Sequence, residues 1–230
     1  MDLTSLYSVP LWNSEYPEFE EHKEIFLSSI KEFRDKNPDG DENRKSNIAG
    51  YQSPPTLHHV KEFRPLFEHI CQMAFKACAD MDFIECDVAV TSAWVNINDS
   101  RQCMNSEHVH GEVFSGVFYL QTPEGSGKLS ITNPAINKMW KGCSLSSQKN
   151  NFTGETVLIN PTEGDIMFFP SYLPHAVQTN DHDEERISIS FNVIALPKGS
   201  IDYSSQKKTI NSKKDDTKWQ YTIETNMSNV

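Results

Sequence analysis

The chain has 230 residues, of which 32 are acidic and 21 are basic, so its formal net charge is −11. This length suits one domain with an appended segment, and a hydrophobic fraction of 37% supports a globular core. The acidic balance and the scattered basic residues argue against general nucleic-acid binding. The chain has no apolar run of ~18 residues for a membrane span, no secretory signal, and five cysteines without a CxxC pair. We therefore expect a cytoplasmic protein that is not bound to a membrane.

The first part of the chain has the apolar period of amphipathic helices. The first set of apolar residues with three- to four-residue spacing comprises Phe19, Ile25, Phe26, Ile30 and Phe33. This spacing predicts a helix that ends at the turn-rich segment 37–41. A second helix is expected over 57–77, where Pro65 would kink or split it. We therefore assign 1–86 to an N-terminal helical support region.

From about Asp87 the apolar period changes to two, which is typical of β-strands. Strand-like segments are 88–97, 115–120, 128–132, 156–159, 165–169 and 186–194. Short strands between Gly, Pro and Asn turns indicate a sandwich or a barrel. The fold class is therefore mainly β with N-terminal helices, with a β-core over 87–196. The polar, lysine-rich segment 197–230 is expected to form a tail.

The segment Glu107-His-Val-His-Gly-Glu112 has the spacing of a metal site. Residues two apart in an extended chain point to the same side, so His108 and His110 could present both imidazoles to one ion. The same argument applies to His110 and Glu112. His175 follows a distant apolar strand and lies directly after Pro174, which makes it a candidate for the remaining ligand.

A possible anion receptor follows one strand later, where Arg186 and Ser188 share a face of the predicted strand. A guanidinium offers two parallel donors and the hydroxyl offers a third, which suits a carboxylate. Each of these residues alone is common on protein surfaces. Their ordered combination, a His-x-His, a distant His and then an Arg-x-Ser, favours a metal site.

These residues resemble the non-haem Fe(II), 2-oxoglutarate-dependent oxygenases. More narrowly, 105–120 is similar to the His-x-His…Ser-Gly-Val-x-Tyr-Leu signature of the putative 2OG-Fe(II) oxygenase family, and 46–53, 92–98 and 186–192 also look familial. The resemblance implies a double-stranded β-helix (jelly-roll) core that binds Fe(II) and 2-oxoglutarate. It further implies a dioxygenase that uses dioxygen to oxidise a small-molecule or amino-acid-residue substrate.

The resemblance also implies roles for single residues. His108 is similar to the first metal ligand and His175 to the distal one. Arg186, with Ser188, is similar to the pair that holds the distal carboxylate of 2-oxoglutarate. Tyr119 and Asn96 are further candidates for hydrogen bonds to 2-oxoglutarate.

The chain departs from the wider superfamily at the carboxylate ligand. That superfamily has His-x-Asp or His-x-Glu, and here His110 occupies the position of the acid. We favour a three-histidine site, and Glu112 remains the alternative carboxylate ligand.

Two other functions are compatible with the sequence. A cupin-type metalloenzyme shares the jelly roll, but the glutamate that cupins usually carry four residues after the His-x-His is replaced by Phe114. A non-catalytic jelly-roll binding module would use the same loops to bind a protein or a sugar.

Overall fold

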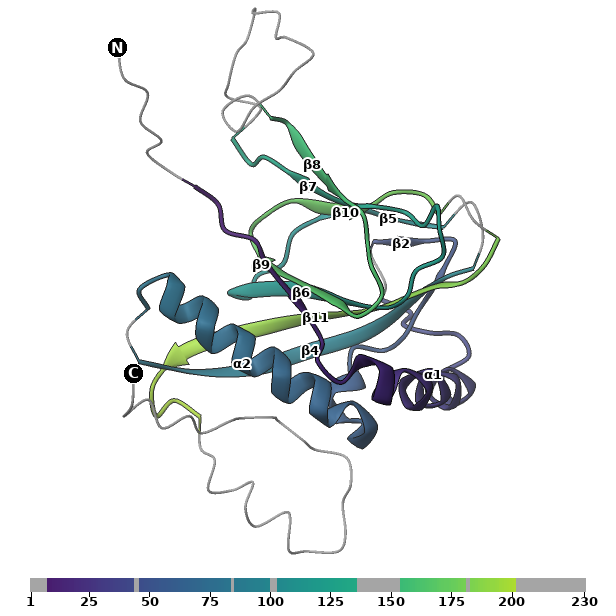
Figure 1. Ribbon diagram of the computed structural model, residues 1–230, viewed down its shortest axis with the longest axis horizontal. Coiled ribbons are helices and arrows are strands. Elements are labelled where there is room, and N and C mark those ends of the chain that lie inside the picture. Colours follow the sequence, from purple (N-terminus) through teal and green to yellow (C-terminus); the bar gives the residue numbers. More distant parts are fainter. Residues whose placement is uncertain are drawn as a thin grey trace, which may run out of the picture.

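The computed structural model describes residues 8–43, 46–83, 85–99, 103–135, 154–180 and 183–201. Within these ranges two antiparallel sheets form the body of the protein, and two α-helices lie against one of them (Figure 1). This is the mainly β, jelly-roll architecture with N-terminal helices that the sequence predicted.

The larger sheet has six strands in the order β1-β9-β6-β11-β4-β3. Their bounds are β1 Trp12–Glu15, β3 Tyr51–Gln52, β4 Cys86–Asn98, β6 Phe114–Gln121, β9 Asp165–Pro170 and β11 Arg186–Pro197. The smaller sheet has five strands in the order β2-β5-β10-β7-β8. Their bounds are β2 Asn47–Ile48, β5 Met104–His108, β7 Leu129–Thr132, β8 Thr156–Ile159 and β10 His175–Val177.

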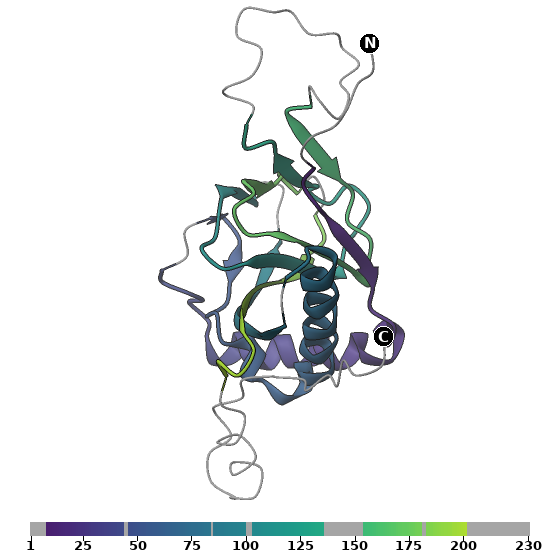
Figure 2. The same cartoon turned by 90° about the vertical axis from the view of Figure 1, so that its left-hand side faces the viewer.

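The helices cover the outer face of the larger sheet, whereas the smaller sheet lies across its inner face (Figures 1 and 2). Helix α1 spans Phe19–Lys36, which confirms the first predicted helix. Helix α2 spans Arg64–Asp80 and is preceded by two short 3-10 turns, η1 (Leu57–His59) and η2 (Lys61–Phe63). Pro65 lies in the first turn of α2, where its missing N–H costs nothing. The second predicted helix is therefore split rather than kinked.

Strand β11 shows how the two faces of the larger sheet differ. The residues on its outer face belong to the apolar core beneath the helices: Ile187, Ile189, Phe191 and Val193. The alternate residues point to the inner face and are polar: Arg186, Ser188, Ser190 and Asn192. The same strand thus stabilises the core with one face and lines the interior between the sheets with the other.

All six predicted strand segments form strands, and the structure adds five short strands that the apolar period did not indicate: β1, β2, β3, β5 and β10. Strand β1 pairs with β9, and β2 and β3 lie at sheet edges. The region 1–86 therefore supplies edge strands as well as helices. The predicted tail lies outside the described residues beyond Ile201. No helix in the described ranges is long and apolar enough to cross a membrane.

Candidate metal centre and carboxylate pocket

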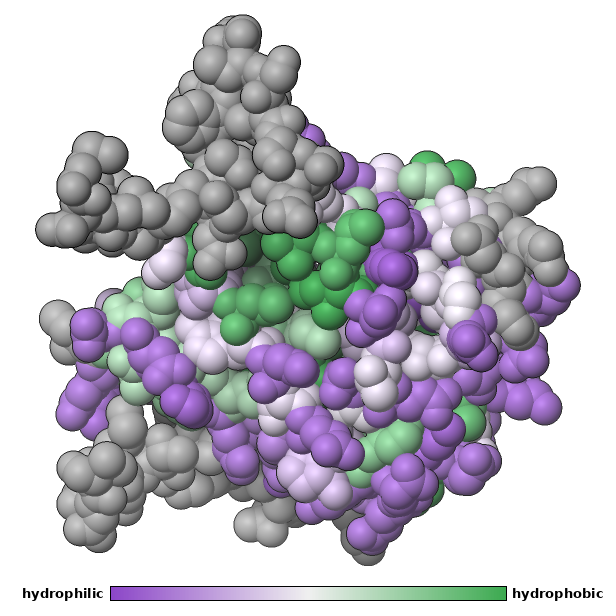
Figure 3. Space-filling view, turned by 45° about the horizontal axis from the view of Figure 1, so that its top comes forward, coloured by the Kyte–Doolittle hydropathy of each residue, from purple (hydrophilic) through white to green (hydrophobic). Residues whose placement is uncertain are grey.

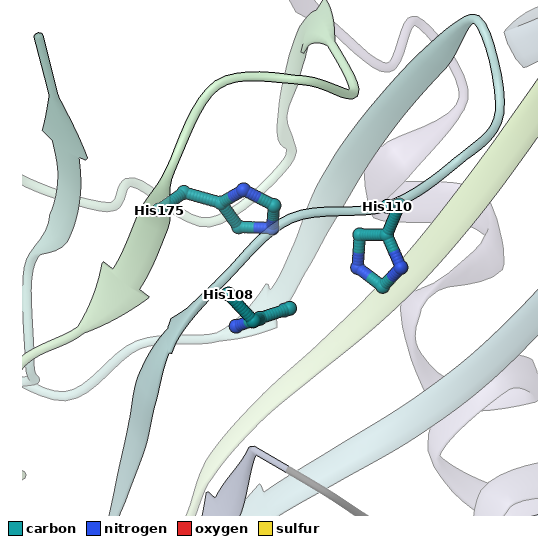
Figure 4. Close-up of side chains that lie close together, drawn as sticks. All are labelled: His108, His110 and His175. Atoms are coloured by element: carbon teal, nitrogen blue, oxygen red, sulfur yellow. The ribbon is translucent and has the colours of Figure 1, made fainter. Parts of the chain in front are cut away.

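Three histidines from two strands and one loop meet between the sheets (Figure 4). His108 is the last residue of β5, His175 is the first residue of β10, and the two are paired directly across the smaller sheet. His110 lies two residues beyond the end of β5. The possible ligand atoms of the three side chains all lie within 4.8 Å of one another. The structure thus brings together the three histidines that the sequence singled out.

Backbone carbonyls fix the tautomers of two of these histidines. Nδ1 of His108 lies 2.7 Å from the carbonyl oxygen of Ser106, and Nδ1 of His175 lies 2.8 Å from that of Leu173. A carbonyl oxygen only accepts hydrogen bonds, so each Nδ1 carries the proton. Each Nε2 therefore has a free lone pair, the arrangement that metal-ligating histidines usually have.

Burial keeps the three imidazoles uncharged at neutral pH. It lowers the pKa of His175 to about 4, with a further contribution from neighbouring His108. Burial also lowers the pKa of His108 and of His110. Three neutral nitrogen donors at this separation suit a divalent transition metal such as iron. The donor set fits the metal that the resemblance implies.

Glu112 is not a member of the histidine cluster. It is half-buried in the loop that precedes β6, and its charge acts on His110 only by raising the pKa of that imidazole against the effect of burial. Phe114, at the position of the cupin glutamate, is buried in the apolar core and contacts Trp12 and Phe168. The described cluster therefore contains three histidines and no carboxylate.

A buried guanidinium lies at the start of β11, next to Ser188 of the same cleft. Arg186 is 1% exposed, and its Nη1 donates to Oγ of Ser188 at 3.1 Å. Its Nε and Nη2 have no hydrogen-bond partner in the described part of the chain. An unpaired buried cation is costly, and its two free N–H groups match the two oxygens of a carboxylate. The pocket therefore fits the distal carboxylate of 2-oxoglutarate.

Tyr119 completes this pocket from the neighbouring strand. It pairs with Ser188 across β6 and β11, and its ring centroid lies 5.4 Å from Cζ of Arg186. Burial raises the pKa of Tyr119 to about 12, which the charge of Arg186 partly offsets. Its hydroxyl lies close enough to the Arg186 guanidinium to interact with it, but has no well-aligned hydrogen-bond partner among the described residues. Tyr119 can therefore donate a further hydrogen bond to an anion held by Arg186.

Asn96 lies on the wall of the same cleft, but its amide is already engaged. Nδ2 of Asn96 donates to Oγ of Ser190 at 3.0 Å, and its Oδ1 accepts from Nδ2 of Asn47 at 3.3 Å. Asn98, which the sequence did not single out, is fully buried opposite Arg186, and its amide atoms have no partner in the described ranges. Asn98 lies two residues after Asn96 on the same strand, so both face the same side, and this spacing was the signal in the sequence that could have identified it.

The cleft around these residues has a mixed lining. Serines and asparagines of β4, β6 and β11 supply polar surface, whereas Val117, Leu129 and Phe169 supply apolar surface. The ring of Phe169 lies 4.8 Å from that of His175, so it borders the metal centre as well as packing in the core. Figure 3 shows the side of the molecule from which β7 and β8 project, and this side has an apolar hollow near its middle.

The fold and the site define a metal-dependent enzyme built on a double-stranded β-helix. Residues 92–192 match the family described as "Putative 2OG-Fe(II) oxygenase", and this segment contains the three histidines with Arg186 and Ser188. This match agrees with the resemblance to 2-oxoglutarate- and Fe(II)-dependent oxygenases that the sequence motifs carry. No curated protein matches the sequence significantly.

Several solved structures share the fold at low sequence identity. The non-haem α-ketoglutarate-dependent carbocyclase SnoK from nogalamycin biosynthesis is 12% identical, with a TM-score of 0.61 over 87% of this chain and 86% of that one. A Pseudomonas putida prolyl-4-hydroxylase is 13% identical, with a TM-score of 0.55 over 83% of this chain and 94% of that one. The epimerase SnoN, solved with Fe3+, α-ketoglutarate and nogalamycin RO, is 12% identical, with a TM-score of 0.56 over 95% and 92% of the two chains.

Proposed function

We propose that this oxygenase binds Fe(II) through His108, His110 and His175 and binds the distal carboxylate of 2-oxoglutarate through Arg186. The observation that carries the proposal is the buried, unpaired guanidinium of Arg186, which bonds to Ser188 on the wall of the cleft that the three imidazoles also line. A guanidinium in such a position is stabilised when an anion occupies the pocket. When bound, iron and 2-oxoglutarate supply the oxidising chemistry, in which dioxygen is consumed and 2-oxoglutarate leaves as succinate and carbon dioxide.

The protein contributes positioning and exclusion of water. The carbonyls of Ser106 and Leu173 hold two imidazoles with Nε2 free, and Arg186 with Ser188 fixes the orientation of the co-substrate. The ring of Phe169 covers one side of His175. These contacts hold the reacting groups in a dry cleft, so the oxidation is directed at a bound substrate.

A three-histidine site has a consequence for charge. Three neutral ligands leave the two positive charges of Fe(II) uncompensated, and Arg186 adds a third. The dianion 2-oxoglutarate would neutralise much of this charge. We therefore expect metal and 2-oxoglutarate to strengthen each other's binding by the same factor, because such coupling is reciprocal.

We further propose a small-molecule or amino-acid-residue substrate, supported by the mixed polar and apolar lining of the cleft. By their names, the structural neighbours include a carbocyclase, an epimerase and a prolyl hydroxylase, so the shared fold serves several substrate classes. A cytoplasmic location is also part of the proposal. It is supported by the four described cysteines, all of which are free thiols.

The test is succinate release from 2-oxoglutarate in the presence of Fe(II), dioxygen and pools of candidate substrates. Calorimetric titration with 2-oxoglutarate and Co(II) measures binding directly. Wild type is expected to bind both ligands, and His175→Ala is expected to lose the metal. His58→Ala is a matched control, because His58 is also buried and its pKa is also lowered to about 4, but it is not part of the cluster. A wild type that binds neither ligand would favour the non-catalytic binding module.

A further inference from the structure

His110 differs from the other two histidines of the cluster in the group that its Nδ1 contacts. His108 and His175 each face a backbone carbonyl, which fixes the tautomer. Nδ1 of His110 instead lies 3.4 Å from Nδ2 of Asn192, the side-chain amide of a residue on β11. An amide can act as a donor or as an acceptor, so its orientation determines which nitrogen of His110 carries the proton.

The described orientation opposes metal binding through Nε2 of His110. With the amide nitrogen of Asn192 facing it, Nδ1 of His110 has to accept the hydrogen bond. A neutral imidazole then carries its proton on Nε2, and that nitrogen has no lone pair for a metal. Among the three histidines, His110 alone has its tautomer set by a group that can reverse its role.

The surroundings of Asn192 allow the amide to turn. Its Nδ2 donates to Oγ of Ser92 at 3.1 Å, and its Oδ1 accepts from Oγ of Ser115 at 2.8 Å. Oγ of Ser115 lies 2.8 Å from Oγ of Ser171, and either hydroxyl can donate in that pair. Hydroxyls donate or accept by rotation, so all of these contacts persist when the amide turns by half a rotation. Both orientations therefore satisfy the buried Asn192 side chain.

The same network connects the segments that carry the ligands. Asn192 is 3% exposed and lies at an irregularity in the pairing of β11 with β4, opposite Ser115 of β6. The N–H of His110 donates to the carbonyl of Ser171, which belongs to the turn that leads to His175. A change at Asn192 is thus transmitted directly to His110 and, through Ser171, to the loop beside it.

We propose that Asn192 is a positioning residue for the third metal ligand: its amide oxygen accepts the Nδ1–H of His110 when metal is bound, which leaves Nε2 of His110 for the metal. The inference rests on the proposed three-histidine site and assigns to it a residue outside the ligand set. The amide can turn within its hydrogen-bond network, so it can present this oxygen to His110. Asn192 thereby fixes the tautomer of His110, as backbone carbonyls fix those of His108 and His175.

The test uses Zn(II), which is diamagnetic, and full-length protein labelled with ¹⁵N in histidine. Two-bond ¹H–¹⁵N correlations of the imidazoles report which ring nitrogen is protonated, and His110→Gln assigns the His110 signals by their loss. With Zn(II) bound, His110 is expected to be in the Nδ1–H form, as are His108 and His175. Zn(II)-induced shifts at His108 and His175 with His110 in the Nε2–H form would overturn the inference and leave metal binding intact. A wild type that binds no Zn(II) would overturn the proposed function as well.

Two variants separate positioning from packing. Asn192→Ala removes the acceptor and is expected to weaken Zn(II) binding about 10- to 100-fold. Asn192→Asp places a group there that only accepts, so it is expected to retain Zn(II) affinity within a few-fold of wild type. Affinities are measured per folded molecule, with thermal unfolding in chelator as the control for stability. If both variants lower the melting temperature and neither changes Zn(II) affinity, Asn192 only packs the structure and the inference is wrong.

Discussion

The two faces of β11 are built from alternate residues of one strand. The apolar residues of the outer face are fully packed, whereas the inner face contains polar groups without partners. On the outer face Ile189 and its neighbours are buried against the helices, and their burial is complete without any ligand. On the inner face Arg186 is equally buried but keeps two N–H groups without partners in the described ranges. An unpaired buried charge opposes folding, whereas a buried isoleucine drives it. The outer face therefore stabilises the fold, and the inner face carries a guanidinium that an anion would pair in the proposed 2-oxoglutarate site.

The largest expected contrast comes from Arg186→Met. Removing an unpaired buried cation is expected to leave the ligand-free protein at least as stable as wild type. The same change is expected to weaken 2-oxoglutarate binding by about 2–5 kcal/mol, because the carboxylate loses its charged partner. Urea unfolding without ligand and calorimetric titration with 2-oxoglutarate measure the two effects. A large loss of unfolding free energy in the ligand-free variant would instead mean that the guanidinium supports the fold.

On the outer face, Ile189→Ala is expected to give the reverse result. Ile189 is fully buried in the core beneath the helices, so its truncation leaves a cavity and is expected to lower the unfolding free energy by about 2–5 kcal/mol. The affinity for Zn(II), measured per folded molecule below the unfolding transition, is expected to stay unchanged. Weakened Zn(II) binding at full folding would show that the two faces are energetically coupled.

The pH dependence of stability should also distinguish His58, which lies next to the helices, from the histidines of the metal centre. Burial, with a contribution from His59, lowers the pKa of His58 from 6.5 to about 4. The unfolded chain therefore binds more protons than the folded one between these pH values. Stability from His58 is complete above about pH 6.5 and is lost as the pH falls towards 4, by roughly 2–3 kcal/mol.

The measurement is urea unfolding of metal-free wild type and His58→Leu across this pH range. His175 has a similarly lowered pKa, so it contributes to the pH dependence of both proteins in the same direction. The difference between the two curves isolates His58. Parallel curves for the two proteins would contradict a buried, neutral His58.

The long helices and strands and the spacing of the candidate ligands could be predicted from the sequence, because both depend on local periodicity. The apolar period of β4 and β11 sets which residues face inwards, and the His-x-His segment with His175 was recognisable from order along the chain. The two-residue strands β2 and β3 have no period to detect, and β10 has three residues. Their pairing depends on contacts between distant segments, which local patterns do not encode.

The finer features of the site could not be read from the sequence for a related reason. Asn192 and Asn98 look like ordinary polar residues of strands, and only the structure shows one beside His110 and the other buried without partners opposite Arg186. The His-x-His segment was expected to be extended throughout, whereas β5 ends at His108 and His110 lies beyond it. Its position depends on the bond from its N–H to the carbonyl of Ser171.

The smallest expected effect concerns Glu112, the alternative carboxylate ligand. Because the ligand cluster contains the three histidines without Glu112, Glu112→Gln is expected to leave Zn(II) affinity nearly unchanged, whereas His110→Gln is expected to lose most of it.

His110→Asp extends the comparison by converting the site to two histidines and one carboxylate. This variant is expected to keep the metal and to depend less on 2-oxoglutarate for metal affinity, because the new carboxylate supplies negative charge that the co-substrate otherwise provides. Calorimetric titrations with and without 2-oxoglutarate measure both quantities, and loss of metal in Glu112→Gln would reassign the third ligand to Glu112.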